Sequence, residues 1–211
     1  MEPAMGGAAA KPSLRDALRA ATASRHAALD AAVAFDAATI TRAEYGRFVT
    51  RLCALVIPLE TRLHAIDGFR ARLPEAEARR KSAALVADLA VLGHGPRPAV
   101  LVQIPRIESE GAAWGCSYVL EGATLGGAVL ARQMGPALGL APGRGLSYWT
   151  VYGDQVGALW RSYLAALESW AASAPPREHG EAVEAAVATF DAFLQIFHGK
   201  PVVGAGGVAH A

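Results

Sequence analysis

The feature that most constrains the fold is an almost continuous helical pattern. Alanine, leucine and arginine dominate the sequence, and runs of β-branched residues with alternating polarity are scarce. Residues of high helix propensity without the period of a strand predict an all-α fold with almost no sheet. Of the 211 residues, 53% are hydrophobic and 18% are charged, so the chain can bury a large core. We therefore expect a single-domain helical bundle.

Capping residues, glycines and prolines divide the chain into six helical segments. Thr41 and Glu44 form a capping box at the start of the second segment, and Pro58 is expected to kink it. The glycine- and proline-rich stretch after Met134 is expected to end the fourth segment. The predicted helices cover about 13–34, 41–63, 74–92, 109–134, 147–172 with an interruption near Gly153, and 177–198. Residues 1–12 and 200–211 lack periodicity and are predicted to be disordered tails.

Charge and cysteine content exclude several classes of protein. The formal net charge is +1, and no block of like charges suggests binding to nucleic acid or to a membrane surface. Cys53 and Cys116 lie far apart in segments that read as buried helix, which indicates reduced core thiols. The N-terminus lacks the pattern of a secretory signal, and no stretch reaches the roughly 18 apolar residues of a membrane span. The expected location is the cytoplasm.

The segment SYVLEGATLGGAVLAR, residues 117–132, carries three glycines inside a helical pattern. Each glycine in a helix costs about 0.8 to 1 kcal/mol relative to alanine, so their presence needs a reason. Gly122 and Gly126 are four residues apart and share one helix face, with Gly127 beside them. This bare face could receive another helix in close packing. Alternatively, a planar ligand could lie against it.

A planar ligand such as haem needs an axial ligand, and histidine is the candidate. His26 lies in the middle of a helix, where small neighbours leave room beside the imidazole and Thr22 and Leu29 occupy adjoining faces. A partly exposed histidine without a ligand would fit the same pattern. Of the other candidates, four have an easy surface explanation, namely His94, His179, His198 and His210, and the fifth is His64.

Several stretches together resemble the haem oxygenase family, in particular its bacterial, biliverdin-producing branch. LRAATASRHAALD resembles the proximal helix with its Thr-x-x-x-His element, and YVLEGATLGGAVLAR resembles the glycine-rich distal helix. YGDQVGALWRSYLAAL and ATFDAFLQIFHG resemble the two C-terminal helices. The likeness extends over a domain of residues 13–199. It implies a haem held between His26, the proximal iron ligand, and the face formed by Gly122, Gly126 and Gly127.

The resemblance also implies roles for other residues. The family's basic contacts to the haem propionates align with Arg19 and Arg161, which are equally compatible with solvated surface positions. Haem contacts are further implied for Thr22, Tyr118, Phe190 and Phe197, although plain core packing would also explain both phenylalanines.

The distal helix departs from the family in one respect. Many members place an aspartate just after the first distal glycine, where this chain has Ala123. Among Ala123, Thr124 and Leu125 only Thr124 has a hydroxyl, so the proton route is expected to use ordered waters held by the main chain, by Thr124 or by another polar group.

The implied reaction uses haem as both substrate and cofactor. Electrons from an external donor reduce the iron, O2 binds opposite His26, and the ring is opened to biliverdin, carbon monoxide and ferrous iron. The sequence has no flavin or nicotinamide fingerprint, so a ferredoxin or a flavoprotein reductase is the expected donor. A phytochrome is a possible acceptor of the biliverdin. Two alternatives stay open: a non-catalytic haem carrier or sensor on the same fold, and a helical module, such as a thiaminase-type scaffold, that binds no haem.

Overall fold

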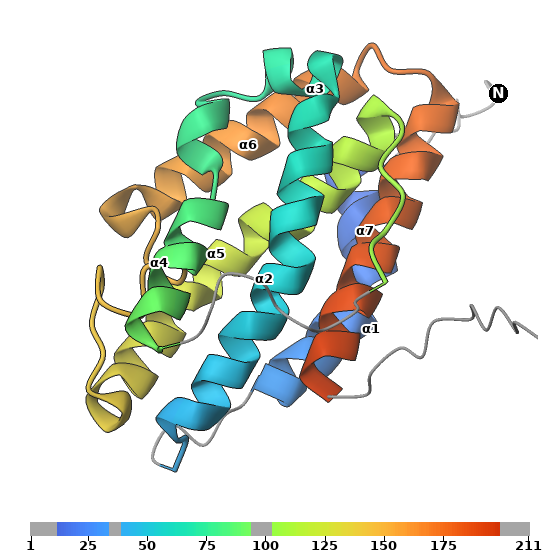
Figure 1. Ribbon diagram of the computed structural model, residues 1–211. Coiled ribbons are helices and arrows are strands. Elements are labelled where there is room, and N and C mark those ends of the chain that lie inside the picture. Colours follow the sequence, from blue (N-terminus) through green and yellow to red (C-terminus); the bar gives the residue numbers. More distant parts are fainter. Residues whose placement is uncertain (1–11, 34–38, 94–102, 199–211) are drawn as a thin grey trace, which may run out of the picture.

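The computed structural model describes residues 12–33, 39–93 and 103–198 (Figure 1). Within these ranges the chain forms seven α-helices and two 3-10 helices, and no strand occurs there. The elements are α1 (Leu14–Val33), α2 (Arg42–Ala65), α3 (Asp67–Arg72), η1 (Ala76–Arg79), α4 (Ser82–Val91), α5 (Glu110–Leu138), η2 (Gly153–Gln155), α6 (Val156–Ala171) and α7 (Pro176–His198). The all-α prediction is confirmed. The predicted disordered tails fall almost wholly on residues 1–11 and 199–211, outside the described ranges.

The bundle is organised around α5, its longest helix, and α7 (Figure 1). α7 packs along α5 on one side and along α1 on the other, so the first and last helices lie side by side. An ion pair of 2.7 Å between Arg25 Nε and Asp191 Oδ1 joins α1 to α7. α2 packs mainly against α4. No helix of the described residues is both long enough and apolar enough to cross a membrane.

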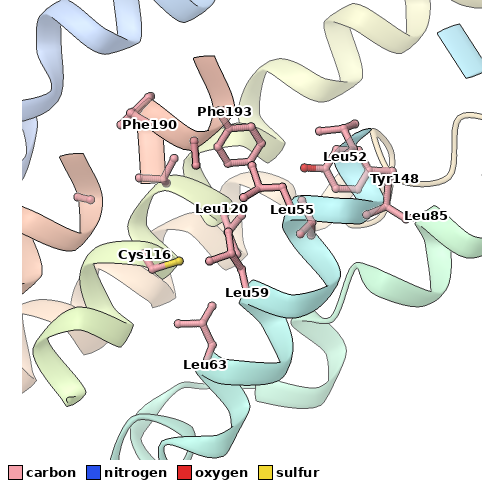
Figure 2. Close-up of a cluster of buried hydrophobic side chains, with 14 of the residues drawn as sticks. Leu52, Leu55, Leu59, Leu63, Leu85, Cys116, Leu120, Tyr148, Phe190 and Phe193 are labelled. Atoms are coloured by element: carbon pink, nitrogen blue, oxygen red, sulfur yellow. The ribbon is translucent and has the colours of Figure 1, made fainter. Parts of the chain in front are cut away.

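The central core lies between α2, α4, α5 and α7 (Figure 2). On α2, leucines spaced three and four residues apart form one continuous apolar face. The side chains that meet there are Leu52, Leu55, Leu59, Leu63, Leu85, Cys116, Leu120, Tyr148, Phe190 and Phe193 (Figure 2). The two cysteines are buried free thiols, as predicted. Burial raises the pKa of each to about 12, so both stay protonated at neutral pH.

The long helix α5 begins and ends at identifiable capping residues. Ser109 is its N-cap, and the hydroxyl accepts a hydrogen bond of 3.1 Å from the amide of Ala112. We predicted an end near Met134, which is wrong, because the helix continues to Leu138. The end is a Schellman motif at Gly139, whose φ of 61° lies in the left-handed region that glycine tolerates.

Two other predictions of helix boundaries need correction. The continuous helix predicted for 74–92 is broken into η1 and α4, because Glu75 adopts a left-handed φ of 50° and the side chains of Arg79 and Lys81 turn into the interior. The predicted helix 147–172 begins only at Val156, after turns and η2. The capping box of Thr41 and Glu44 on α2 is present as predicted.

Candidate functional site

A cavity of about 500 Å³ opens between α1, α5 and α7. His26 of α1 lines one side, and Gly122 and Gly126 of α5 line another. The remaining walls are mostly apolar and aromatic; among them are Leu29, Tyr118, Leu125, Tyr148, Trp149, Trp160, Phe190, Phe193 and Phe197. This volume and this largely apolar lining are typical of sites for small organic ligands and cofactors. The structure therefore brings the candidate histidine and two of the three candidate glycines to one cavity.

The three glycines of α5 have different surroundings. A methyl group at Gly126 would meet no other atom within 4 Å, and one at Gly122 would meet only the Trp160 ring at 3.8 Å. Gly127 is different, because a methyl group there would lie 2.7 Å from the carbonyl oxygen of Trp149. Gly122 and Gly126 thus leave open space, whereas Gly127 permits close packing. In the described part of the chain, the Trp160 ring of α6 is the only group of another helix that a methyl group at either position would meet within 4 Å.

The imidazole of His26 is paired on one nitrogen. Nδ1 lies 2.9 Å from Oδ2 of Asp30, one helical turn further along α1. This pairing favours the tautomer that carries its proton on Nδ1, which leaves Nε2 available as a ligand atom. The ring centroid lies 5.8 Å from that of Phe190, and the side chain is 64% exposed. His26 therefore stands at the mouth of the cavity.

The two predicted basic contacts lie outside the cavity lining and are exposed. Burial raises the pKa of the Tyr118 phenol, and the charges of Arg15 and Arg19 oppose that rise, which places both guanidinium groups near this cavity residue. Arg161 follows Trp160 in the sequence, and the Trp160 ring packs 5.7 Å from that of Tyr118. Arg19 thus acts on Tyr118 through its charge, whereas Arg161 is linked to this end of the cavity only as the sequence neighbour of Trp160.

Two predicted hydroxyl groups point elsewhere. Thr22 is buried and donates to the carbonyl of Leu18 at 2.8 Å. Thr124 is buried and donates to the carbonyl of Glu121 at 2.6 Å. Neither residue lines the cavity, while Ala123 does. The polar group expected to stand in for the distal carboxylate is therefore committed to the backbone.

The two predicted phenylalanines both line the cavity, and the structure adds partners that the sequence reasoning missed. Phe193 lies one turn from Phe190 on the same face of α7, so the helical spacing could have revealed it. Trp149 had no such signal. Its indole Nε1 donates to the Tyr45 hydroxyl at 3.1 Å, and Tyr45 donates to the carbonyl of Gly145 at 2.9 Å.

A buried carboxylate holds the same segment from another side. Asp88 of α4 accepts hydrogen bonds of 2.8 Å from the backbone amides of both Ser147 and Tyr148. Contacts between residues so distant in sequence are not visible in a local pattern.

His64 had no interpretation from the sequence, and the structure buries it. This side chain of α2 is only 8% exposed and does not line the cavity. The expected loop at His94 and tail at His210 lie outside the described residues, as does the side chain of His198.

Comparisons with known proteins point to one family. The family model described as "Heme oxygenase" matches residues 12–199. A heme oxygenase of Xanthomonas campestris pv. campestris is 40% identical over 116 residues, which are 54% of this chain and 66% of the relative. The aligned part thus falls just short of two thirds of that relative's length.

Solved structures show the same fold. The NO- and CO-bound heme oxygenase from Neisseria meningitidis superposes with a TM-score of 0.77 at 20% identity, covering 92% of this chain and 96% of the other. Heme oxygenase from Leptospira interrogans gives a TM-score of 0.73 at 19% identity, covering 88% and 98%. The chain belongs to the haem oxygenase family, because the family model matches nearly its whole length.

Proposed function

We propose that this protein is a haem oxygenase, which cleaves haem to biliverdin, carbon monoxide and ferrous iron. The observation that supports the proposal best is the shared cavity of His26 and the open face at Gly122 and Gly126. A histidine ligand on one wall and a side-chain-free backbone on the other suit a flat ring that carries iron. Haem is both the cofactor and the substrate, and O2 and electrons come from outside the protein.

The residues of the cavity fit haem in their chemistry. His26 offers Nε2 to the iron, because Asp30 occupies Nδ1. A neutral imidazole is a common proximal ligand in haem proteins. Phe190, Phe197 and Trp149 provide apolar surface for the ring, which keeps bulk water away from it.

The charges at the cavity edge fit the propionates. Arg19 lies close enough to Tyr118 to affect the pKa of its phenol, and Arg161 borders Trp160. Guanidinium groups bind carboxylates through paired, charge-assisted hydrogen bonds. We therefore propose that Arg19 and Arg161 would hold the propionates of a bound haem.

A non-catalytic haem carrier or sensor is the second candidate. Ala123 lines the cavity where many family members have an aspartate, and the Thr124 hydroxyl is bonded to the Glu121 carbonyl. An oxygenase must deliver protons to the distal face, whereas a carrier need not. This specific lack of a polar side chain at Ala123 favours the carrier.

Partners follow from the proposed chemistry. A ferredoxin or a flavoprotein reductase would supply the electrons, and a phytochrome could accept the biliverdin.

Addition of hemin tests the proposal directly. The purified protein is titrated with hemin, and spectra are recorded before and after ferredoxin, its reductase and NADPH are added. We expect a shifted Soret band that decays to the absorption of biliverdin. A stable band would support the carrier instead, and no shifted band would show that the cavity does not hold haem.

A further inference from the structure

A cluster of buried charges lies behind the cavity, on the side of α5 away from it. The Glu121 cluster consists of Arg79, Lys81, Glu121 and Tyr152. The side chains of Arg79, Lys81 and Glu121 are 1%, 3% and 4% exposed. Arg79 pairs with Oε2 of Glu121, and Lys81 Nζ and the Tyr152 hydroxyl each lie 2.7 Å from Oε1. One carboxylate thus receives two cations and a phenol.

Such a cluster is difficult to explain by stability alone. Taking charges out of water costs several kcal/mol per ion in order of magnitude, and apolar replacements are often neutral or stabilising. Directional bonds between fixed partners do define one geometry, however, which an apolar contact does less well. The question is therefore which geometry the Glu121 cluster fixes.

The cluster joins three segments that each supply a wall of the cavity. Glu121 precedes Gly122 on α5. Arg79 also donates to the carbonyl of Leu159 at 3.1 Å and to the hydroxyl of Ser162 at 2.7 Å, which are the neighbours in α6 of cavity residue Trp160. Tyr152 ends the segment 147–152, which carries the cavity residues Tyr148 and Trp149.

The cavity side of α5 cannot define this position by itself. Among the described residues, a methyl group at Gly126 would meet no atom within 4 Å, and one at Gly122 would meet only the Trp160 ring. Besides the packing of α5 along α7, this part of the helix is restrained by the Glu121 carboxylate and by the close approach of Gly127 to the Trp149 carbonyl. Because successive residues of a helix are about 100° apart, a contact at position 121 fixes the direction in which position 122 faces.

We propose that Glu121 is a positioning residue that sets the rotation and depth of the Gly122 and Gly126 face over the haem. It acts through Arg79, Lys81 and Tyr152 and does not itself enter the cavity. The inference rests on the proposed function for its consequence, because the position of that face decides which edge of the ring is open to oxidation. Loss of the clamp should therefore change the ratio of biliverdin isomers.

The test compares four variants with the wild type. Glu121→Gln keeps the shape but removes the charge, and Glu121→Asp keeps the charge but shortens its reach. The double variant Glu121→Gln with Lys81→Met removes one cation together with the carboxylate, so the net charge of the cluster stays the same. It serves as the test if Glu121→Gln alone fails to fold. Leu63→Ala is the matched control, because it weakens the core at a buried residue that does not line the cavity (Figure 2).

Two readouts separate positioning from stability. Chromatography of the products gives the isomer ratio, which does not depend on the folded fraction. The C–O stretching frequency of the CO-loaded ferrous protein reports the distal surroundings of the haem without turnover. We expect Glu121→Gln and the double variant to change the isomer ratio by roughly tenfold, which corresponds to ~1.4 kcal/mol between competing barriers, and to shift the C–O frequency. Glu121→Asp should restore part of both values.

The control outcomes are also decisive. Leu63→Ala should lower the melting temperature and leave both readouts at their wild-type values. If the double variant keeps the wild-type isomer ratio and C–O frequency, or if Leu63→Ala changes them equally, Glu121 has no positioning role. A wild-type protein that binds haem without cleaving it would refute the proposed function only, because the C–O frequency would still test Glu121.

Discussion

The two walls of the cavity are built in opposite ways. On α1, the wall that carries His26, the imidazole is 64% exposed and the neighbouring Ala23 and Ala27 are exposed as well. On α5, the wall that carries the glycines, residues 111–117 are all buried, and Glu121 is clamped from behind. The candidate ligand therefore lies on a helix face that contributes little to the core. The glycine face of the cavity, in contrast, lies on a helix that the core holds in place.

This difference implies that binding and stability can be separated by mutation. A change on the exposed face of α1 should alter haem binding with little effect on folding. A change on the packed side of α5 should alter folding first. The following predictions test that contrast, from the largest expected effect to the smallest.

Replacement of His26 by alanine should have the largest effect. Outer-shell partners of a metal ligand typically contribute about 10- to 100-fold to affinity or activity, so loss of the ligand itself should cost more than ~100-fold in turnover. Stability of the haem-free protein should change by less than ~0.5 kcal/mol, because the side chain is exposed. The rate of biliverdin formation with ferredoxin, its reductase and NADPH, and chemical denaturation of the haem-free protein, measure the two quantities.

Replacement of His179 provides the control for this variant. Its Nε2 lies 3.0 Å from the carbonyl of Ala171, far along the chain from the cavity residues of α7, and it does not line the cavity. His179→Ala should retain the ferric spectrum of the wild type. An unchanged spectrum in His26→Ala would show that another group binds the iron.

Alanine at the two adjacent glycines should give opposite changes in stability. At Gly126 the methyl group meets nothing, so Gly126→Ala should stabilise the haem-free protein by about 0.5 to 1 kcal/mol. At Gly127 it meets the Trp149 carbonyl at 2.7 Å, and overpacking should destabilise by about 1 to 3 kcal/mol. Urea denaturation of both variants checks the signs. Equal signs would mean that the two faces of α5 do not differ as described.

Hemin affinity should fall more in Gly126→Ala than in Gly127→Ala, although Gly126→Ala has the more stable fold. The added methyl of Gly126→Ala lies on the cavity face, so hemin affinity should fall although the fold is more stable. The added methyl of Gly127→Ala lies against Trp149 and outside the cavity lining, so the hemin affinity of the folded protein should fall less than in Gly126→Ala. A ratio of affinity to folded fraction that falls equally in both would contradict this.

Replacement of Asp30 by asparagine should have a moderate effect. Asparagine keeps the size of the side chain but removes the charge that pairs with Nδ1 of His26 at 2.9 Å. Because Asp30 is 70% exposed, the loss should lie at or below the lower end of the range for outer-shell groups, about 10-fold. The ferric spectrum and the hemin dissociation constant report it. A hemin affinity equal to that of the wild type would show that Asp30 does not influence the ligand.

Local patterns revealed helices, caps and the glycine face better than the buried anchors. The capping box at Thr41, the helix that carries His26 and the glycines of α5 all follow from short-range spacing, and the structure contains each of them. A face without side chains signals itself in the sequence, because glycine is costly inside a helix. Proximity of His26 to the glycines followed only from resemblance to a family.

The anchors of the packed wall had no local signal. Lysine and arginine are mostly exposed, so Arg79 and Lys81 read as solvated residues of one helix. Their burial depends on a carboxylate about 40 positions away, since Lys81 and Glu121 are separated by 40 residues. Asp88 and Tyr148 are separated by 60 residues. Such pairs are specified by tertiary structure, and a reading along the chain cannot pair them.

His64 provides the smallest expected effect and the sharpest contrast with His26. His64 is a buried residue of α2, and its Nδ1 has no hydrogen-bond partner in the described part of the chain. Burial lowers the pKa of His64, and the nearby charge of Arg80 lowers it further. The other charges acting on this pKa are those of Glu60, Glu77 and Arg70.

The sign of the pH dependence follows from that shift. Below about pH 6.5 the unfolded chain binds a proton at His64 that the folded protein binds less readily, so stability falls as the pH falls. The slope from this one group is at most about 1.4 kcal/mol per pH unit. Denaturation at several pH values from 7 to 5 should show a smaller loss in His64→Gln than in the wild type. Because His64 does not line the cavity, His64→Gln should have the same effect on the pH dependence of stability when it is made in the His26→Ala variant. Loss of that effect in the His26→Ala background would mean that the two histidines are coupled.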